Sequence, residues 1–144
     1  MKKRLLLILF ITLINTSVSS STKTQIRIFN ASDYQVLLNS QKNNAFTLIF
    51  WSLNCTPCLH DLKTIGKQQP EKRKNYVFIA TDGHDVRQAI TKTLKNFNLE
   101  DANHWVLNSD EIEEIRLAID TSWYGETPRI YQFDKNHKRT RITN

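Results

Sequence analysis

The chain has 144 residues, of which 40% are hydrophobic and 24% are charged. This composition is typical of one compact globular domain and excludes a disordered or membrane-embedded chain. Three of the positive charges behind the formal net charge of +6 lie together at positions 2–4, and the others are spread along the chain. The rest of the chain therefore carries a net charge of only +3, spread along its length, and we expect no nucleic-acid partner.

The first 20 residues have the pattern of a secretory signal peptide. Basic residues 2–4 precede a largely apolar run over residues 5–14, and small and polar residues follow over 15–21. A ten-residue helix spans about 15 Å, roughly half of a bilayer's hydrocarbon core, which favours a cleaved signal over an uncleaved anchor. We therefore predict a signal peptide over 1–20 and one domain over 21–144, periplasmic or otherwise exported and soluble after cleavage.

The rest of the chain alternates strand and helix patterns. Residues 25–29 alternate polar and apolar side chains, which predicts a short leading strand. Ser32 is expected to cap a helix over 33–41, with Gln35 as its capping-box partner. The nearly continuous apolar run over 45–53 predicts a strand that is buried on both faces of a sheet.

A helix should follow this strand directly, because Thr56 and Pro57 suit the first turn of a helix. Its apolar positions continue to Ile65, and we expect it to end near Gly66. The basic stretch over 67–74 is interpreted as a solvated helix end and loop. Beyond it, the patterns predict strands over 76–80, 104–107 and 127–133, helices over 85–97 and 111–119 with Ser109 as the cap of the second, a turn over 134–138 and a final hairpin strand over 139–143.

This order of elements predicts an α/β fold with a central mixed sheet flanked by helices and an antiparallel hairpin at one side. No internal repeat or low-complexity linker interrupts the chain. We therefore expect a single structural unit after the signal peptide.

The chain's two cysteines, Cys55 and Cys58, lie where the buried strand meets the following helix. Free backbone N–H groups and the helix dipole favour a thiolate at a helix N-terminus and lower the usual Cys pKa of about 8.5. Cys58 lies about one turn further in, on the same face. We expect Cys55 to be the nucleophile and Cys58 the resolving thiol of a redox-active pair, because so short a disulfide loop stabilises a fold little.

Two alternatives stay open for this pair. A redox-inert disulfide would leave a binding module, and two thiolates with one histidine could hold Cu(I) in a metallochaperone. His60 or His137 would be the third ligand in the second case. Zinc is disfavoured, since no pair of histidines shows finger-like spacing to the cysteines. We therefore expect no metal and no other cofactor.

Three segments together resemble the thioredoxin superfamily, most closely its TlpA-like periplasmic branch. They are residues 50–58 with the CxxC motif, Thr127-Pro128 before a strand, and the polar turn over 134–138. The resemblance covers roughly residues 30–143 and implies a thioredoxin-like fold in which Pro128 is cis and packs against the dithiol. It also implies that the backbone around Thr127 and Pro128 binds substrate in a strand-like way. The segment between the second buried strand and Thr127 would be the TlpA-like elaboration.

The resemblance implies an exported thiol–disulfide oxidoreductase that exchanges disulfides with protein clients and leans toward the reductase direction. A membrane electron donor or acceptor would be a second partner, and the oligomeric state stays open. Trp51, next to the dithiol, is a third candidate substrate-binding residue, with packing in the core as the alternative. Trp123 and Tyr124, on the loop before Thr127, are interpreted either as packing residues or as partner contacts.

The sequence also departs from the thioredoxin pattern. Asn54 stands where an aromatic residue usually precedes the first cysteine, and Ile49 stands where a buried acid usually lies. Asp61 is either a weaker proton acceptor or a solvated helix residue. The terminal helix is apparently missing, since the chain stops at Asn144. The leading helix over 33–41 would compensate for it, or that side of the sheet is less covered, with low stability or a partner that covers it; these alternatives stay open.

Overall fold

A computed structural model describes residues 26–143. The predicted signal peptide and its cleavage region lie outside the described residues. In the described part of the chain, no helix has the length and apolarity that crossing a bilayer requires.

A six-stranded sheet in the order β1-β4-β3-β2-β5-β6 forms the middle of the fold. Strands β1, β4, β3 and β2 run parallel to one another, whereas β5 is antiparallel to both β2 and β6. This mixed α/β sheet confirms the predicted fold class. The strands are β1 (Arg27–Phe29), β2 (Phe46–Trp51), β3 (Tyr76–Ala80), β4 (Asn103–Leu107), β5 (Arg129–Phe133) and β6 (Arg139–Ile142); the helices are α1 (Asp33–Ser40), α2 (Thr56–Gly66), α3 (Pro70–Arg73), α4 (Arg87–Asn96) and α5 (Ile112–Ile119), with a 3₁₀ turn η1 (Ser109–Glu111) before α5.

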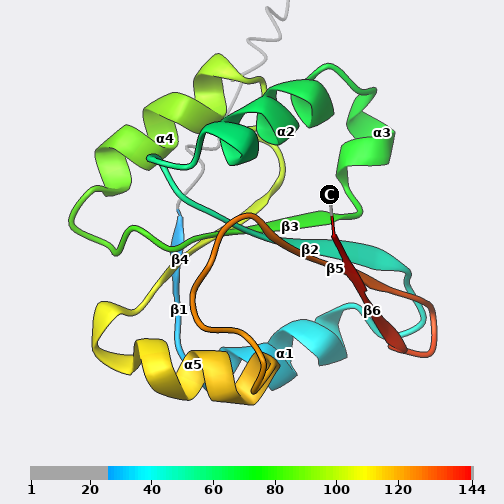
Figure 1. Ribbon diagram of the computed structural model, residues 1–144. Coiled ribbons are helices and arrows are strands. Elements are labelled where there is room, and N and C mark those ends of the chain that lie inside the picture. Colours follow the sequence, from blue (N-terminus) through cyan, green and yellow to red (C-terminus); the bar gives the residue numbers. More distant parts are fainter. Residues whose placement is uncertain (1–25, 144) are drawn as a thin grey trace, which may run out of the picture.

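Helices cover both faces of the sheet, as Figure 1 shows: α2, α3 and α4 lie on one side, and α1 and α5 on the other. Each side has its own hydrophobic core. Alternate residues of β2 enter the two cores, with Leu48 and Phe50 on the α1–α5 side and Ile49 and Trp51 on the α2–α4 side. This two-sided burial explains why the β2 segment is apolar at nearly every position and confirms its predicted place inside the sheet.

The helix starts differ from those predicted. The Ser32 side chain makes no capping bond to α1; instead, the Asp33 carboxylate accepts hydrogen bonds from the backbone and side-chain nitrogens of Asn30, at 2.8 and 2.9 Å. Before α5, the Asn108 side chain rather than Ser109 accepts from the backbone N–H of Asp110, at 3.2 Å. In both cases several capping residue types stand next to one another, so the local pattern fits more than one choice.

The basic stretch over 67–74 is not wholly solvated, which corrects the prediction for Arg73. This side chain is buried, donates hydrogen bonds to the backbone carbonyls of Gly66 and Asn98, and pairs with Asp101 at 2.9 Å. It therefore joins the ends of α2 and α4, where Gly66 lies so close to the Phe97 carbonyl that a Cβ would not fit. A buried arginine with carbonyl acceptors looks like any surface arginine in the sequence.

His104 should make the stability of the fold depend on pH. Its ring is buried beside Phe78, and burial lowers its pKa to about 4. The folded state therefore keeps this ring neutral at a pH where the unfolded chain binds a proton. We expect the free energy of unfolding to fall, by up to about 1.4 kcal/mol per pH unit, between about pH 6.5 and pH 4.

Urea unfolding of the wild type and of His104→Phe at pH 7 and pH 5 measures this effect. The wild type should lose more stability between the two pH values than the variant does. His60→Gln is the matched control, since it removes a histidine whose side chain is 81% exposed. Equal pH dependence in the wild type and His104→Phe would contradict the prediction.

Candidate active site at the start of helix α2

The two cysteines lie at the N-terminus of α2, shortly after the end of β2. Cys55 is the N-cap residue of α2, with extended backbone angles (φ −98°, ψ 96°), and Pro57 lies in the first turn. The Cys55 sulfur accepts a hydrogen bond from the backbone N–H of Cys58 at 3.2 Å. This N–H is one of the helix's unpaired N-terminal donors, so the predicted placement of the Cys55 sulfur at the positive end of the helix is confirmed.

Cys55 and Cys58 form a disulfide whose Cα atoms are 5.2 Å apart. The two residues differ in access, since Cys55 is 8% exposed and Cys58 is 0% exposed. Both pack in the α2–α4 core, together with Leu62 and Ile65 of the same helix. Cys55 is therefore the more accessible residue of the pair.

A cleft of about 500 Å³ opens beside Cys55. Most of its lining comes from the loop before Cys55 and the first turn of α2, and Thr127 also lines it. The antiparallel pairing of β2 with β5 causes this approach, because Phe50 and Arg129 are register partners and Thr127 precedes Arg129 by two residues. The lining residues are Ser52, Asn54, Cys55, Thr56, Pro57 and Thr127.

The Thr127–Pro128 peptide bond is cis, as the resemblance implies. Both residues are partly buried, and Thr127 faces the cleft, whereas Pro128 is not among the residues that line it. The structure thus brings Thr127 and Cys55 to the same cleft, and Pro128, the next residue, does not line it.

Asp82 holds the loop before Cys55 in place, a role that the sequence analysis does not predict. Its carboxylate accepts hydrogen bonds from the Leu53 backbone N–H, at 3.0 and 3.1 Å, and from the Ser52 hydroxyl at 2.9 Å. Thr81 adds two hydrogen bonds to the Trp51 carbonyl. The contact could have been expected from the sequence, because the residues that follow β2 and β3 lie at the same edge of the sheet if these strands are parallel neighbours.

Several solved structures that share this fold are described as disulfide oxidoreductases or interchange proteins. A secreted disulfide oxidoreductase of Mycobacterium tuberculosis, described as homologous to E. coli DsbE, is 19% identical, with 74% of this chain and 73% of that chain covered and a TM-score of 0.52. The thioredoxin domain of a Bacteroides vulgatus thiol–disulfide oxidoreductase is 16% identical, covering 74% and 75%, with a TM-score of 0.56. This chain has a thioredoxin-like fold.

A third thioredoxin-like structure is a thiol:disulfide interchange protein of Chlorobium tepidum, which is 16% identical over 74% of both chains, with a TM-score of 0.55. By sequence alone, no protein-family model and no curated protein matches. The thioredoxin-like fold is therefore recognised through its three-dimensional arrangement, together with the CxxC motif.

The surroundings of the dithiol differ from the usual thioredoxin-like pattern, as the sequence indicates. Ile49 is buried on the α2–α4 side, so a hydrophobic side chain occupies the place of the usual buried acid. Trp51 is only 1% exposed and packs in the same core, so its side chain supports the dithiol from inside the domain. Asp61 lies one turn after Cys58, and its Oδ2 atom is buried without a hydrogen-bond partner in the described structure. Asp61 is therefore not a simple solvated helix residue.

The histidines considered as metal ligands do not join the cysteines. His137 contacts the Gln41 carbonyl and the Phe46 ring, at the start of β2, whereas the cysteines follow the end of β2. His60 is on α2, and its imidazole lies 3.8 Å from the carboxylate of Asp61. Over residues 26–143, no group of three or more His, Cys, Asp or Glu side chains is placed to hold a metal ion.

Trp123 and Tyr124 divide the two roles that the sequence left open. Trp123 is buried against Phe50, with ring centroids 4.4 Å apart, and its indole N–H donates to the Glu126 carbonyl. Tyr124, its neighbour, is 81% exposed. One residue thus packs on the sheet, and the other is available for contact with a partner.

Proposed function

We propose that this protein is an exported thiol–disulfide oxidoreductase that exchanges disulfides with protein clients through Cys55 and Cys58. The observation that carries the proposal is the position of the pair: a disulfide at the N-terminus of α2, with Cys55 alone accessible, beside a cleft that Thr127 completes. A structural disulfide gains nothing from this position, whereas thiolate chemistry does.

In the reductase direction, the Cys55 thiolate attacks one sulfur of a client disulfide and releases the other client sulfur as a thiolate. Cys58 then attacks the Cys55 sulfur in the mixed disulfide, which frees the second client thiol and forms the Cys55–Cys58 bond. The client gains two electrons and the protein loses two. The Cys58 thiol must give up its proton for the second step, and the partnerless carboxylate oxygen of Asp61 makes this residue a candidate acceptor.

The cleft supports a client that lies against the backbone at Thr127 and Pro128. A strand-like segment there would bring its disulfide to Cys55, which lines the same cleft. The side chain of Trp51 lies beneath this surface, so we assign to it the support of the dithiol rather than direct contact.

The predicted signal peptide over residues 1–20 supports an exported location, and one structural neighbour is described as secreted. The preference for reduction rests on the resemblance to TlpA-like proteins. A reductase outside the cytoplasm needs a continuing source of electrons, and a membrane protein that transfers them to Cys55–Cys58 would supply it.

Trapping the mixed disulfide tests the proposal. In Cys58→Ser, the first step proceeds and the second cannot, so incubation with oxidised insulin or glutathione disulfide should give an adduct that peptide mass spectrometry locates at Cys55. Cys55→Ser is the control, and it should give little adduct because Cys58 is 0% exposed. The proposal fails if Cys58→Ser forms no adduct with either disulfide.

A further inference from the structure

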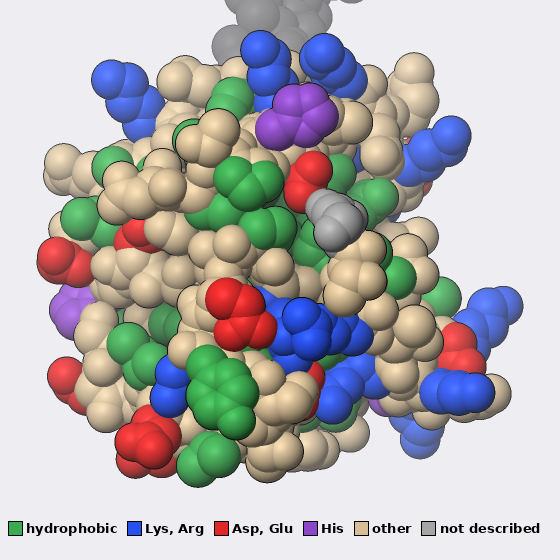
Figure 2. Space-filling model, viewed as in Figure 1, with side chains coloured by type: hydrophobic (Ala, Val, Ile, Leu, Met, Phe, Trp, Pro, Cys, Tyr) green, Lys and Arg blue, Asp and Glu red, His purple; other side chains and the backbone are tan. Residues whose placement is uncertain are grey.

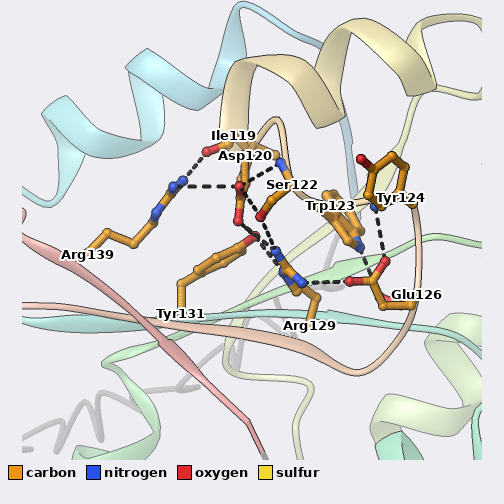
Figure 3. Close-up of polar contacts among 9 residues, drawn as sticks. All are labelled: Ile119, Asp120, Ser122, Trp123, Tyr124, Glu126, Arg129, Tyr131 and Arg139. Atoms are coloured by element: carbon orange, nitrogen blue, oxygen red, sulfur yellow. Dashed lines mark hydrogen bonds and ion pairs between the residues drawn. The ribbon is translucent and has the colours of Figure 1, made fainter.

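The loop that carries Thr127 to the cleft has no helix or strand of its own. It connects α5 to β5 over residues 120–128, and three of its side chains, those of Asp120, Ser122 and Glu126, accept hydrogen bonds from Arg129 (Figure 3). A loop of this kind keeps its shape only through such contacts. The residues that make them therefore decide where Thr127 lies.

Arg129 holds both ends of the loop from inside the domain. Its side chain is 1% exposed, and its guanidinium donates to Asp120 at 2.6 Å and to Glu126, also at 2.6 Å. The third nitrogen, Nε, donates to the Tyr131 hydroxyl at 2.7 Å, and that hydroxyl donates to Asp120. Asp120 begins the loop and Glu126 precedes Thr127, so one buried cation fixes the start and the end of the segment.

Glu126 transmits this anchoring to the exposed part of the loop. One oxygen of its carboxylate accepts from Arg129, while the other accepts from the backbone N–H of Tyr124 at 3.0 Å. Gly125 lies between Tyr124 and Glu126 and has a φ of +100°. Glycine adopts this conformation readily, and it lets the chain turn back here. The Tyr124 carbonyl also accepts from Arg116 of α5 at 2.8 Å.

As a result, Tyr124 points outward while its backbone is held on both sides. Its side chain is 81% exposed, three residues before Thr127 in the chain. On the face that carries α5 and the following loop, hydrophobic, acidic and basic side chains lie next to one another (Figure 2). A mixed surface with an exposed aromatic ring suits contact with a polypeptide, because tyrosine offers a large apolar ring and a polar end.

We propose that Glu126 is a positioning residue that, held by Arg129, sets Thr127 at the cleft and presents Tyr124 to polypeptide clients. This inference rests on the proposed function and names the residues behind its substrate preference: the loop should favour a disulfide in a polypeptide over the same bond in a small molecule. A small disulfide needs only the cleft at Cys55, and Tyr124 is not among the residues that line this cleft.

The test compares two substrates in one set of variants. Glu126→Gln keeps the size of the side chain but replaces one of the two accepting oxygens with an NH2 donor, so either Arg129 or the Tyr124 N–H loses its acceptor. We expect kcat/KM for insulin reduction to fall about five- to ten-fold more than kcat/KM for glutathione disulfide, the order expected from the loss of one hydrogen bond of ordinary strength. Glu113→Gln is the matched control, since it removes the same charge from an exposed position on α5.

Tyr124→Ala gives a second arm. If Glu126 acts by placing Tyr124, this variant should show the same selective loss with insulin, and the double variant should lose little more than either single variant. Equal losses with the two substrates, no loss, or fully additive losses would each overturn the inference. A wild type that reduces neither insulin nor glutathione disulfide would instead contradict the proposed function, so the two failures are distinguishable.

Discussion

Replacing Cys55 with serine should reduce catalysed insulin reduction to the rate of the uncatalysed reaction. A hydroxyl cannot replace the thiolate that starts disulfide exchange, and the remaining thiol of Cys58 is 0% exposed. The measurement is the rate of insulin reduction with excess dithiothreitol, with and without protein. In the proposed mechanism the whole rate acceleration depends on the Cys55 sulfur, so no partial activity is expected.

Cys58→Ser separates the two thiols in the same assay. This variant keeps the nucleophile, so it should react once with insulin and then stop in the mixed disulfide unless dithiothreitol releases it. Cys55→Ser should show no such first reaction. If Cys55→Ser kept a rate within a few-fold of the wild type, the assignment of the nucleophile would be wrong.

Replacing Asp120 with alanine should cause the largest loss of stability among single changes outside the hydrophobic cores. Arg129 would keep its charge at 1% exposure, and the half-exposed Glu126 would be the one left of its two carboxylates at 2.6 Å. Breaking a buried ion pair typically costs about 3–5 kcal/mol, because the remaining charge is kept from solvent and has lost a partner. The Tyr131 hydroxyl would lose its acceptor as well. Urea unfolding of the oxidised protein at pH 7 measures the loss.

Glu71→Ala is the matched control for this prediction. Glu71 pairs with Lys74 at 2.7 Å, but both side chains are well exposed, so its removal should change the free energy of unfolding by less than about 1 kcal/mol. If Asp120→Ala cost no more than Glu71→Ala, the loop would not depend on the buried pair, and the positioning role of Glu126 would lose its basis.

The cost of Asp120→Ala should also depend on pH. Burial acts to raise the pKa of Asp120, but hydrogen bonds from Tyr131, Ser122 and Arg129 outweigh it and hold the pKa well below its usual range. The carboxylate therefore contributes full stability above the pKa of about 3.9 that an unfolded Asp has, and loses it as the pH falls further. The difference between wild type and variant should be constant from pH 7 to pH 5 and should shrink below about pH 4.

The local features of the site could be predicted from the sequence, because each depends on neighbouring residues. The continuous apolar run of β2, the pair Cys55–Cys58 and the helix-starting Pro57 follow one another directly in the chain. Their order alone indicates a strand, a nucleophile and a helix N-terminus. The second half of the cleft required the resemblance, since Thr127 comes to Cys55 only through the pairing of β5 with β2.

The polar contacts that support the site could not be predicted in the same way. Arg129 looks like the solvated first residue of a strand, and its burial becomes evident only when α5 and the loop after it are placed over the sheet. Asp82 and Arg73 likewise bind partners from other elements. Pattern and propensity describe one element at a time, whereas each of these side chains joins two.

The equilibrium redox potential of the Cys55–Cys58 couple tests the central claim most directly. The full-length protein is equilibrated in glutathione or dithiothreitol buffers, quenched with acid, and the fraction of disulfide is measured by alkylation and mass spectrometry. A thiol–disulfide oxidoreductase should equilibrate rapidly, with a midpoint between about −270 and −120 mV, the range of known thioredoxin-like enzymes. Slow exchange with a midpoint below about −300 mV is typical of a structural disulfide, and that result would contradict the account.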